Sequence, residues 1–142
     1  MAVLAAPSAS LCSAGVTGSV TSAAAAFTWS CAGTGGGSTA ACSAPRQYNV
    51  TPTAGAGGSI SPGSAQAVTY NASTSFTVTP SSGYGISTVS GCGGSLAGST
   101  YTTGAVTTNC TVSASFSLLP PSTYPIHIAA SRSEERRVGK EC

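Results

Sequence analysis

The side chains that could take part in chemistry are few in this chain, and most of them are cysteines and tyrosines. Residues 1–131 contain no Asp, Glu or Lys, and Arg46 supplies the charge in that stretch. General acid–base catalysis needs a positioned carboxylate, His, Lys, Tyr or Cys. A paired-carboxylate glycosidase site, a Ser-His-Asp triad and a carboxylate calcium site are therefore excluded from this part of the chain. We expect no catalytic residue, no cofactor and no metal ion.

The one histidine, His127, could suggest proton transfer or metal binding. It lies in a proline-rich stretch and has no carboxylate neighbour in the sequence. We therefore expect it to be an ordinary exposed side chain.

The six cysteines contain no Cys-x-x-Cys pair, which favours disulfides over a zinc site. Disulfides persist in oxidising compartments, so we expect an exported protein that is extracellular or at the cell surface. Cys92 and Cys110 are predicted to bond, because Cys110 points inward and a hairpin between them brings the two ends together. Cys31 and Cys42 are predicted to bond across another hairpin, which leaves Cys12 unpaired.

Four tyrosines are the candidates for a ligand-binding face: Tyr48, Tyr70, Tyr84 and Tyr101. An exposed, coplanar pair of these rings would favour carbohydrate or matrix binding. Burial would favour a structural role, and we expect most of them in the core because small domains need their aromatic side chains inside. We expect Trp29 in a core for the same reason.

Residues 48–118 carry the alternation of apolar and hydroxyl side chains that predicts β-strands. Phe76 and Val78 alternate with Ser and Thr, and the run from Cys110 to Leu118 repeats the pattern with its apolar side chains inward. Val89 is out of phase with Ile86 by one residue, which predicts a β-bulge. We expect about five or six short strands in this stretch.

A smaller unit is predicted before it. Phe27, Trp29 and Cys31 alternate, a glycine-rich stretch follows, and the alternation resumes up to Cys42. This pattern predicts a hairpin that places Cys31 and Cys42 nearly opposite each other. Ser43 to Gln47 are expected to be a linker, because Pro45 and a change of composition mark a boundary.

The fold class is thus all-β, with two small disulfide-stapled modules in tandem, at 1–45 and 46–119. Residues 120–131 are predicted to be a proline-rich linker. Residues 132–142 hold seven of the eight charged side chains and read as the translation of a sequencing adapter. We interpret them as an artefact of assembled environmental DNA, and the chain as a fragment whose signal peptide lies upstream. No run approaches the roughly 20 apolar residues of a membrane span.

Several segments of the second module resemble the divergent form of the internalin B-repeat, a bacterial repeat domain. The matching segments are Tyr48-Asn-Val-Thr-Pro52, Gly58-Ser-Ile-Ser-Pro62, Phe76-Thr-Val-Thr-Pro80 and Cys110-Thr-Val-Ser-Ala-Ser-Phe116. The resemblance implies an all-β module, either β-grasp-related or a small sandwich, that stands in tandem in bacterial surface or secreted proteins. It implies no catalytic residues, and neighbouring repeats of the same chain as partners.

The first module resembles a cysteine-rich unit of bacterial exported repeat proteins. The segments that carry this resemblance are Leu11-Cys12, Phe27-Thr-Trp29-Ser-Cys31 and Ala41-Cys42-Ser-Ala-Pro45. The resemblance implies a further cysteine before Cys12, so we expect the start of this unit to be missing.

The sequence therefore favours a non-catalytic spacer or adhesive repeat of an exported bacterial surface protein. The alternative is a carbohydrate- or matrix-binding accessory module of a secreted hydrolase. Polysaccharide or a host matrix protein would be the external partner. A net charge of +2 without a basic stripe argues against nucleic acid.

Overall fold

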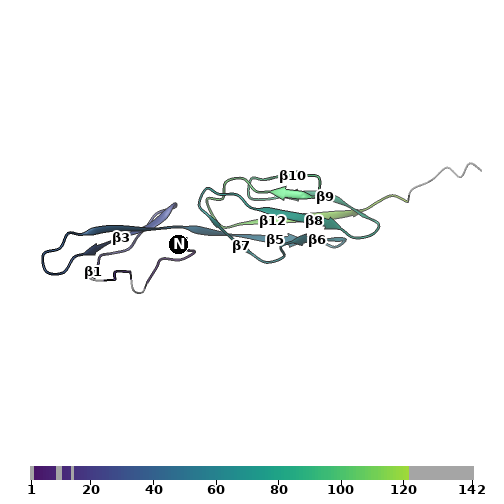
Figure 1. Ribbon diagram of the computed structural model, residues 1–142. Helices are drawn as coiled ribbons and strands as arrows, with labels where there is room; N and C mark the ends of the chain where they lie inside the picture. Colours follow the sequence, from purple (N-terminus) through teal and green to yellow (C-terminus); the bar gives the residue numbers. More distant parts are fainter. Residues whose placement is uncertain (1, 9–10, 14, 122–142) are drawn as a thin grey trace, which may run out of the picture.

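The computed structural model describes residues 2–8, 11–13 and 15–121, which form two β-units arranged end to end (Figure 1). No helix occurs in this described part of the chain. The all-β prediction is therefore confirmed. The tail at 132–142 and His127 lie outside the described residues, as does the proline-rich segment beyond its first two residues.

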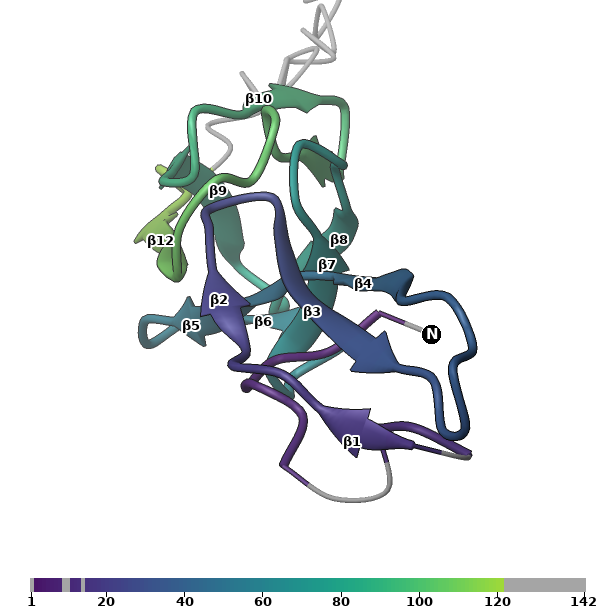
Figure 2. The same ribbon diagram turned by 90° about the vertical axis from the view of Figure 1, so that its left-hand side faces the viewer.

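The first unit is built around one strand, β3, at Ala26–Ala32. β4, at Ala40–Pro45, pairs with one side of it in an antiparallel hairpin. Two short strands, β1 at Val16–Thr17 and β2 at Thr21–Ser22, pair with its other side (Figure 2). The predicted hairpin is therefore present.

The expected linker from Ser43 to Gln47 is wrong. β4 ends at Pro45 and β5 begins at Gln47, so one strand path runs from the first unit into the second. Arg46 between them donates its backbone N–H to the Ala25 carbonyl at 2.9 Å, and its carbonyl accepts from Tyr70 N–H at 2.8 Å. Because both backbone groups of Arg46 are held, the residue acts as part of the β-structure rather than as a free hinge.

The second unit contains eight strands, more than the sequence indicated, because several are only three or four residues long. Their bounds are β5 Gln47–Ala54, β6 Gly58–Ser61, β7 Gln66–Thr69, β8 Ser75–Pro80, β9 Tyr84–Ser90, β10 Ser95–Ala97, β11 Thr100–Thr102 and β12 Cys110–Leu118. They form two four-stranded sheets with the orders β7-β5-β12-β9 and β10-β11-β8-β6. All neighbouring strands are antiparallel except β5 and β12, which are parallel.

The two sheets face each other and enclose one hydrophobic core, so the sandwich is the architecture adopted (Figure 1). The buried residues come from both sheets and from the loop before β12: Val50, Ile60, Val68, Phe76, Val78, Tyr101, Val106, Val112 and Ala114. Their alternation along β8 and β12 is the pattern that the sequence shows. Leu118 departs from it and is 70% exposed, because it lies at the last position of β12.

The predicted bulge is present in β9. In the ladder with β12, Ser115 lies opposite Thr88 and Phe116 lies opposite Ile86, so Ser87 is the extra residue. This extra residue shifts the alternation between Ile86 and Val89, which explains why the two apolar residues differ in phase.

Candidate functional site

The four candidate tyrosines do not form one face. Tyr101, on β11, is 1% exposed, and its hydroxyl donates to the Gly91 carbonyl at 2.6 Å. Tyr84, at the start of β9, lies against Gly57 so closely that a side chain there would overlap its ring. Tyr48 and Tyr70 are neighbours, with ring centroids 6.3 Å apart.

The Tyr48–Tyr70 pair lacks the geometry of a sugar platform. The planes of the two rings are inclined by 52°, so they are not coplanar. The Tyr48 hydroxyl donates to the Ala24 carbonyl of the first unit at 2.9 Å. Tyr48 is therefore engaged in the contact between the two units, and the pair does not present two parallel faces to a ligand.

Arg46 is the centre of that contact. Its guanidinium carbon lies 5.0 Å from the Phe27 ring centroid and 5.2 Å from that of Tyr48, within the range of cation–π attraction. Its terminal nitrogen donates to the Ser22 hydroxyl at 3.0 Å and to the Ala23 carbonyl at 3.2 Å. One guanidinium thus joins an aromatic ring from each unit, the last residue of β2 and the loop that follows it.

The linker predicted from the sequence includes Arg46, and this prediction misses the role of Arg46 at the joint. A clue was available, since Arg46 and Tyr48 are two residues apart and point to the same side of an extended chain. The contact of Arg46 with Phe27 could not be predicted from this spacing. It depends on the β3–β4 hairpin, which brings Phe27 to Arg46.

The N-terminal segment adds backbone contacts at the same place. Val3 N–H donates to the Pro45 carbonyl at 2.8 Å, and Gln47 N–H donates to the Val3 carbonyl at 2.6 Å. These bonds make a parallel bridge between Val3 and Arg46. Chain segments from both units and from the N-terminal region therefore meet at Arg46.

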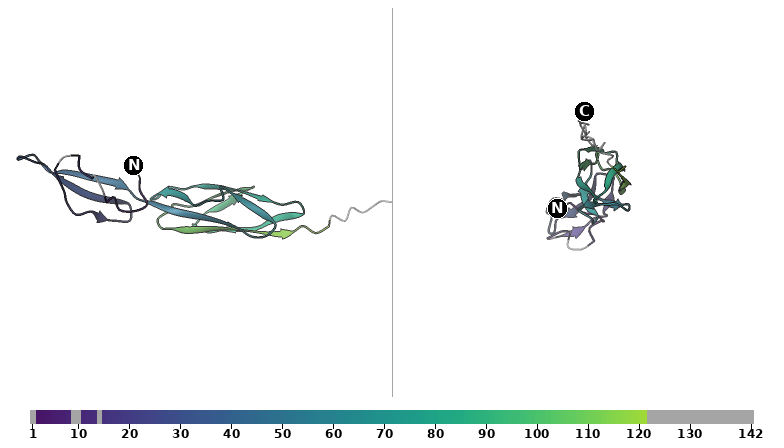
Figure 3. Two further views of the ribbon diagram at one scale, coloured as in Figure 1. Left: turned by 90° about the horizontal axis from the view of Figure 1, so that it is seen from below. Right: turned by 90° about the vertical axis from the view of Figure 1, so that its right-hand side faces the viewer.

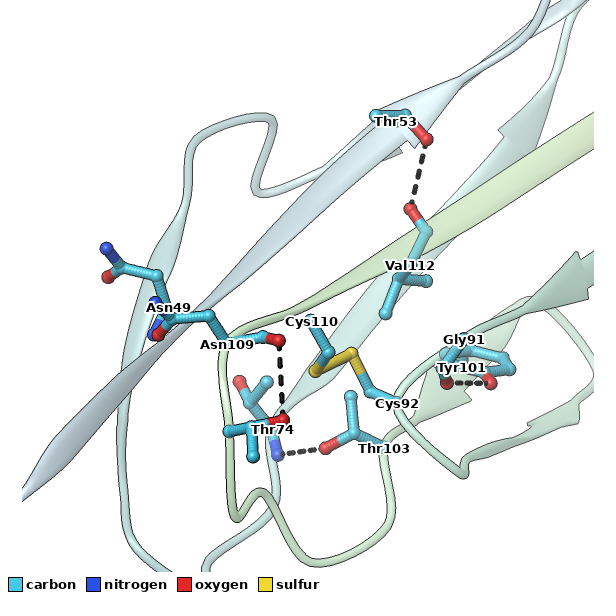
Figure 4. The surroundings of a disulfide bond; sticks show 11 residues. Asn49, Thr53, Thr74, Gly91, Cys92, Tyr101, Thr103, Asn109, Cys110 and Val112 are labelled. Atoms are coloured by element: carbon cyan, nitrogen blue, oxygen red, sulfur yellow. Dashed lines mark hydrogen bonds between the residues drawn. A yellow bond between two sulfur atoms is a disulfide. The ribbon is translucent and has the colours of Figure 1, made fainter. Parts of the chain in front are cut away.

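The disulfide expected between Cys92 and Cys110 is present, with Cα atoms 5.6 Å apart (Figure 4). Cys92 follows the end of β9 and Cys110 begins β12, so the bond closes the end of the β9–β12 ladder. Nearby, Thr103 is buried and exchanges two hydrogen bonds with Thr74, accepting from its N–H at 3.0 Å and donating to its carbonyl at 2.9 Å. The polar groups around this disulfide hydrogen-bond to backbone and hydroxyl partners, which indicates a structural role for this part of the molecule.

The disulfide expected between Cys31 and Cys42 is wrong, and Cys12 is not free. Cys31 bonds with Cys12, with Cα atoms 5.7 Å apart, and Cys42 retains its thiol. In the β3–β4 ladder Cys42 lies opposite Trp29, which makes Cys31 its diagonal neighbour. Diagonal Cα atoms lie about 7–8 Å apart, whereas disulfides need about 4.4–6.8 Å.

Cys12 reaches Cys31 through the pairing of β1 with β3. Thr17 lies directly opposite Cys31, and its hydroxyl donates to the Cys12 sulfur at 3.4 Å. Between Cys12 and Thr17, Gly15 has a φ of +99°, a left-handed conformation that glycine adopts at no steric cost. The turn at Gly15 thus returns the chain toward β3.

A shallow hollow of about 440 Å³ lies on the first unit. Its lining includes the hydroxyl side chains of Ser19, Thr21, Thr28, Ser30 and Ser43, and no lining residue is charged. Trp29, Ala41 and Cys42 complete the lining, and the Trp29 Nε1–H donates to the Leu11 carbonyl at 3.2 Å. The hollow is therefore lined mainly by hydroxyl groups, with Trp29 as its aromatic residue.

Within the described ranges, no group of three or more His, Cys, Asp or Glu side chains is placed to hold a metal ion. The same ranges contain no helix long and apolar enough to cross a membrane.

Comparison with known proteins gives one match. The family model described as "Divergent InlB B-repeat domain" matches residues 48–120, which are 73 of the 142 residues. No curated protein and no solved structure matches the chain. The matched stretch coincides with the sandwich and begins two residues after Arg46.

Proposed function

Because the chain belongs to the divergent InlB B-repeat family, we propose that it is a non-catalytic spacer repeat of an exported bacterial surface protein. The observation that supports this role is the parallel pairing of β5 and β12, the first and last strands of the sandwich. Parallel strands run in the same direction, so the chain comes in at one end of the sandwich and leaves at the other. A module of this kind adds length wherever it is inserted.

The length follows from the register. Val50 lies opposite Cys110, Gln47 lies three residues before Val50, and Leu118 lies eight residues after Cys110. The two ends are therefore eleven residue steps apart along the sheet, or roughly 36 Å at about 3.3 Å per residue. This separation is a large part of the length of the second unit (Figure 3).

The joint at Arg46 supports the same role, because a spacer works best when its units do not fold back on each other. The continuous path from β4 to β5 sets the direction of the units, and the guanidinium between Phe27 and Tyr48 resists bending. The two disulfides fit a protein that functions in an oxidising environment outside the cell.

The arrangement of the tyrosines does not favour the carbohydrate- or matrix-binding alternative. One ring is fully buried, one packs on a glycine, and the remaining pair is tilted and used at the joint. Saturable binding of the whole chain to a polysaccharide or a matrix protein would support that alternative instead.

The spacer proposal is tested by measuring whether the two units tumble as one body. Residual dipolar couplings of the backbone amides should fit a single alignment tensor for both units in the parent protein. In Arg46→Ala the couplings of the two units should require different tensors, while each unit keeps its own internal fit. Thr51→Ala, on an exposed position of β5, is the matched control and should behave like the parent.

Two different tensors in the parent protein would contradict the proposal, because the units would then be connected flexibly. A single tensor in Arg46→Ala would leave the spacer role intact but would show that the strand path, and not the guanidinium, holds the joint.

A further inference from the structure

Three sulfur atoms meet in the first unit. Cys12 and Cys31 form the disulfide, and the Cys42 sulfur lies 3.9 Å from that of Cys31. Cys42 retains its hydrogen, so in this contact its thiol is the donor. All three side chains are partly exposed, so solvent can reach the cluster.

We propose that Cys12, Cys31 and Cys42 form a thiol–disulfide exchange site, in which Cys42 displaces Cys12 from Cys31. Exchange proceeds by attack of a thiolate on a disulfide sulfur. The Cys42 thiol gives its proton to water, and its sulfur forms a bond with the Cys31 sulfur. The Cys31–Cys12 bond breaks, and its electron pair goes to the Cys12 sulfur, which takes a proton from water. No oxidant or reductant is consumed, because one disulfide and one thiol are present before and after.

The surroundings favour this direction of attack. Cys42 and Cys31 are held on neighbouring strands of one ladder, so their encounter needs no diffusion. Cys12 lies outside the named strands, so its release breaks no pairing of a β-ladder. The Thr17 hydroxyl, which donates to the Cys12 sulfur at 3.4 Å, stabilises negative charge on the leaving sulfur.

The ladder also determines which isomer predominates. Cys31 and Cys42 are diagonal neighbours, so bonding them requires β3 and β4 to shift slightly. The Cys12–Cys31 bond needs no such shift. We therefore expect the Cys31–Cys42 form as the minor isomer, and its consequence is a free thiol on Cys12 at the surface of the first unit.

The test uses the full-length oxidised protein with Cys142→Ser, so that the sixth cysteine takes no part. The protein is incubated at mildly alkaline pH without added thiol or oxidant, treated with N-ethylmaleimide at intervals, and digested for peptide mapping. A short pulse should label Cys42, and label on Cys12 should increase with the time of incubation. With Cys42→Ser, label on Cys12 should fall by about tenfold or more, because the attacking thiolate is missing.

A second variant tests whether the minor bond can form at all. In Cys12→Ser, a glutathione redox buffer should join Cys31 to Cys42 and protect both from N-ethylmaleimide. Labelling of both residues in this variant would overturn the proposal, as would label confined to Cys42 in the parent protein after long incubation. Equal labelling of Cys12 with and without Cys42 would also overturn it, since the Cys12–Cys31 bond would then open by another route.

Discussion

Replacing both Cys92 and Cys110 by serine is the most direct test of what holds the sandwich together. Their disulfide closes a loop with a sequence separation of 18 residues, which contains the β10–β11 hairpin. In the folded protein this loop is also held by Gly104 N–H, which donates to the Cys92 carbonyl at 3.0 Å, and by the Tyr101 hydroxyl bond to Gly91. The serine variant keeps these hydrogen bonds and loses the constraint on the unfolded chain.

The expected loss follows from the length of the loop. The chain-entropy model gives about 3 kcal/mol for a loop of this size. A domain of about 70 residues has a free energy of unfolding on the order of 5 kcal/mol, so the disulfide would supply more than half of it. At about 4–8 °C for each kcal/mol in a small domain, the midpoint of thermal unfolding should fall by roughly 12–24 °C.

The assay needs a signal from each unit. Trp29 is the single tryptophan of the chain and lies in β3, so its fluorescence follows the first unit. Far-UV circular dichroism follows both units, and the part of its transition that Trp29 does not share reports on the sandwich. Cys42→Ser is the matched control and should change the midpoint of the sandwich by less than about 2 °C, because Cys42 belongs to the other unit.

Reducing agent added to the parent protein should lower the sandwich transition as the double variant does. If the double variant instead unfolds within about 3 °C of the parent, the loop entropy is not a main source of stability. The core of the two facing sheets would then have to be much more stable than a domain of this size normally allows.

Four further outcomes are expected. Gly91→Ala should destabilise the sandwich by more than about 3 kcal/mol in urea unfolding, because the φ of Gly91 is +123° and a Cβ there would overlap the Thr111 carbonyl. The control Gly98→Ala should cost only about 1 kcal/mol, because the φ of Gly98 is +62° and a Cβ there would meet open space. Tyr101→Phe should cost about 1–3 kcal/mol by the same method, since it removes the partner of a buried carbonyl. When the chain is pulled from its ends in a force spectrometer, the reduced sandwich should gain roughly 60 Å more contour length than the oxidised one, because 18 residues are released. Deleting 132–142 should leave both thermal midpoints unchanged by calorimetry, and a fall of several degrees would show that these residues pack.

The sequence predicted the parts of the fold that depend on local alternation. Phe76, Val78 and Val112 alternate with hydroxyl residues, and all three are buried between the sheets. The change of phase at Val89 located the bulge, because one extra residue in a strand shifts every following side chain to the other face. These features need only a period of two, which a single sequence displays.

The features that the sequence did not predict correctly depend on the register between strands or on contacts with distant segments of the chain. The pairing of Cys31 was wrong because a two-residue difference in hairpin register exchanges a direct neighbour for a diagonal one. The joint at Arg46 was missed because Phe27, the residue it packs on, is brought there by the hairpin. The sequence identified the candidate tyrosines but not their positions in the fold, because alternation along a strand does not show to which sheet the strand belongs.

The near absence of charge leaves the sandwich with a problem at its sheet edges, where unpaired backbone groups can pair with another chain. Proteins commonly protect such edges with lysine, with bulges or with very short strands. This sandwich contains no lysine, so the topology has to supply the protection. Its two longest strands, β5 and β12, lie inside a sheet and are paired on both sides.

The edge positions are taken by β6 and β7, with four residues each, by β10 with three, and by β9, which is longer but bulged at Ser87. Each edge therefore carries one of the two protective features that need no charge. This arrangement protects the sandwich from sideways pairing with another β-chain without the use of charge. The same parallel β5–β12 pair that gives the module its length also keeps its two longest strands away from the edges.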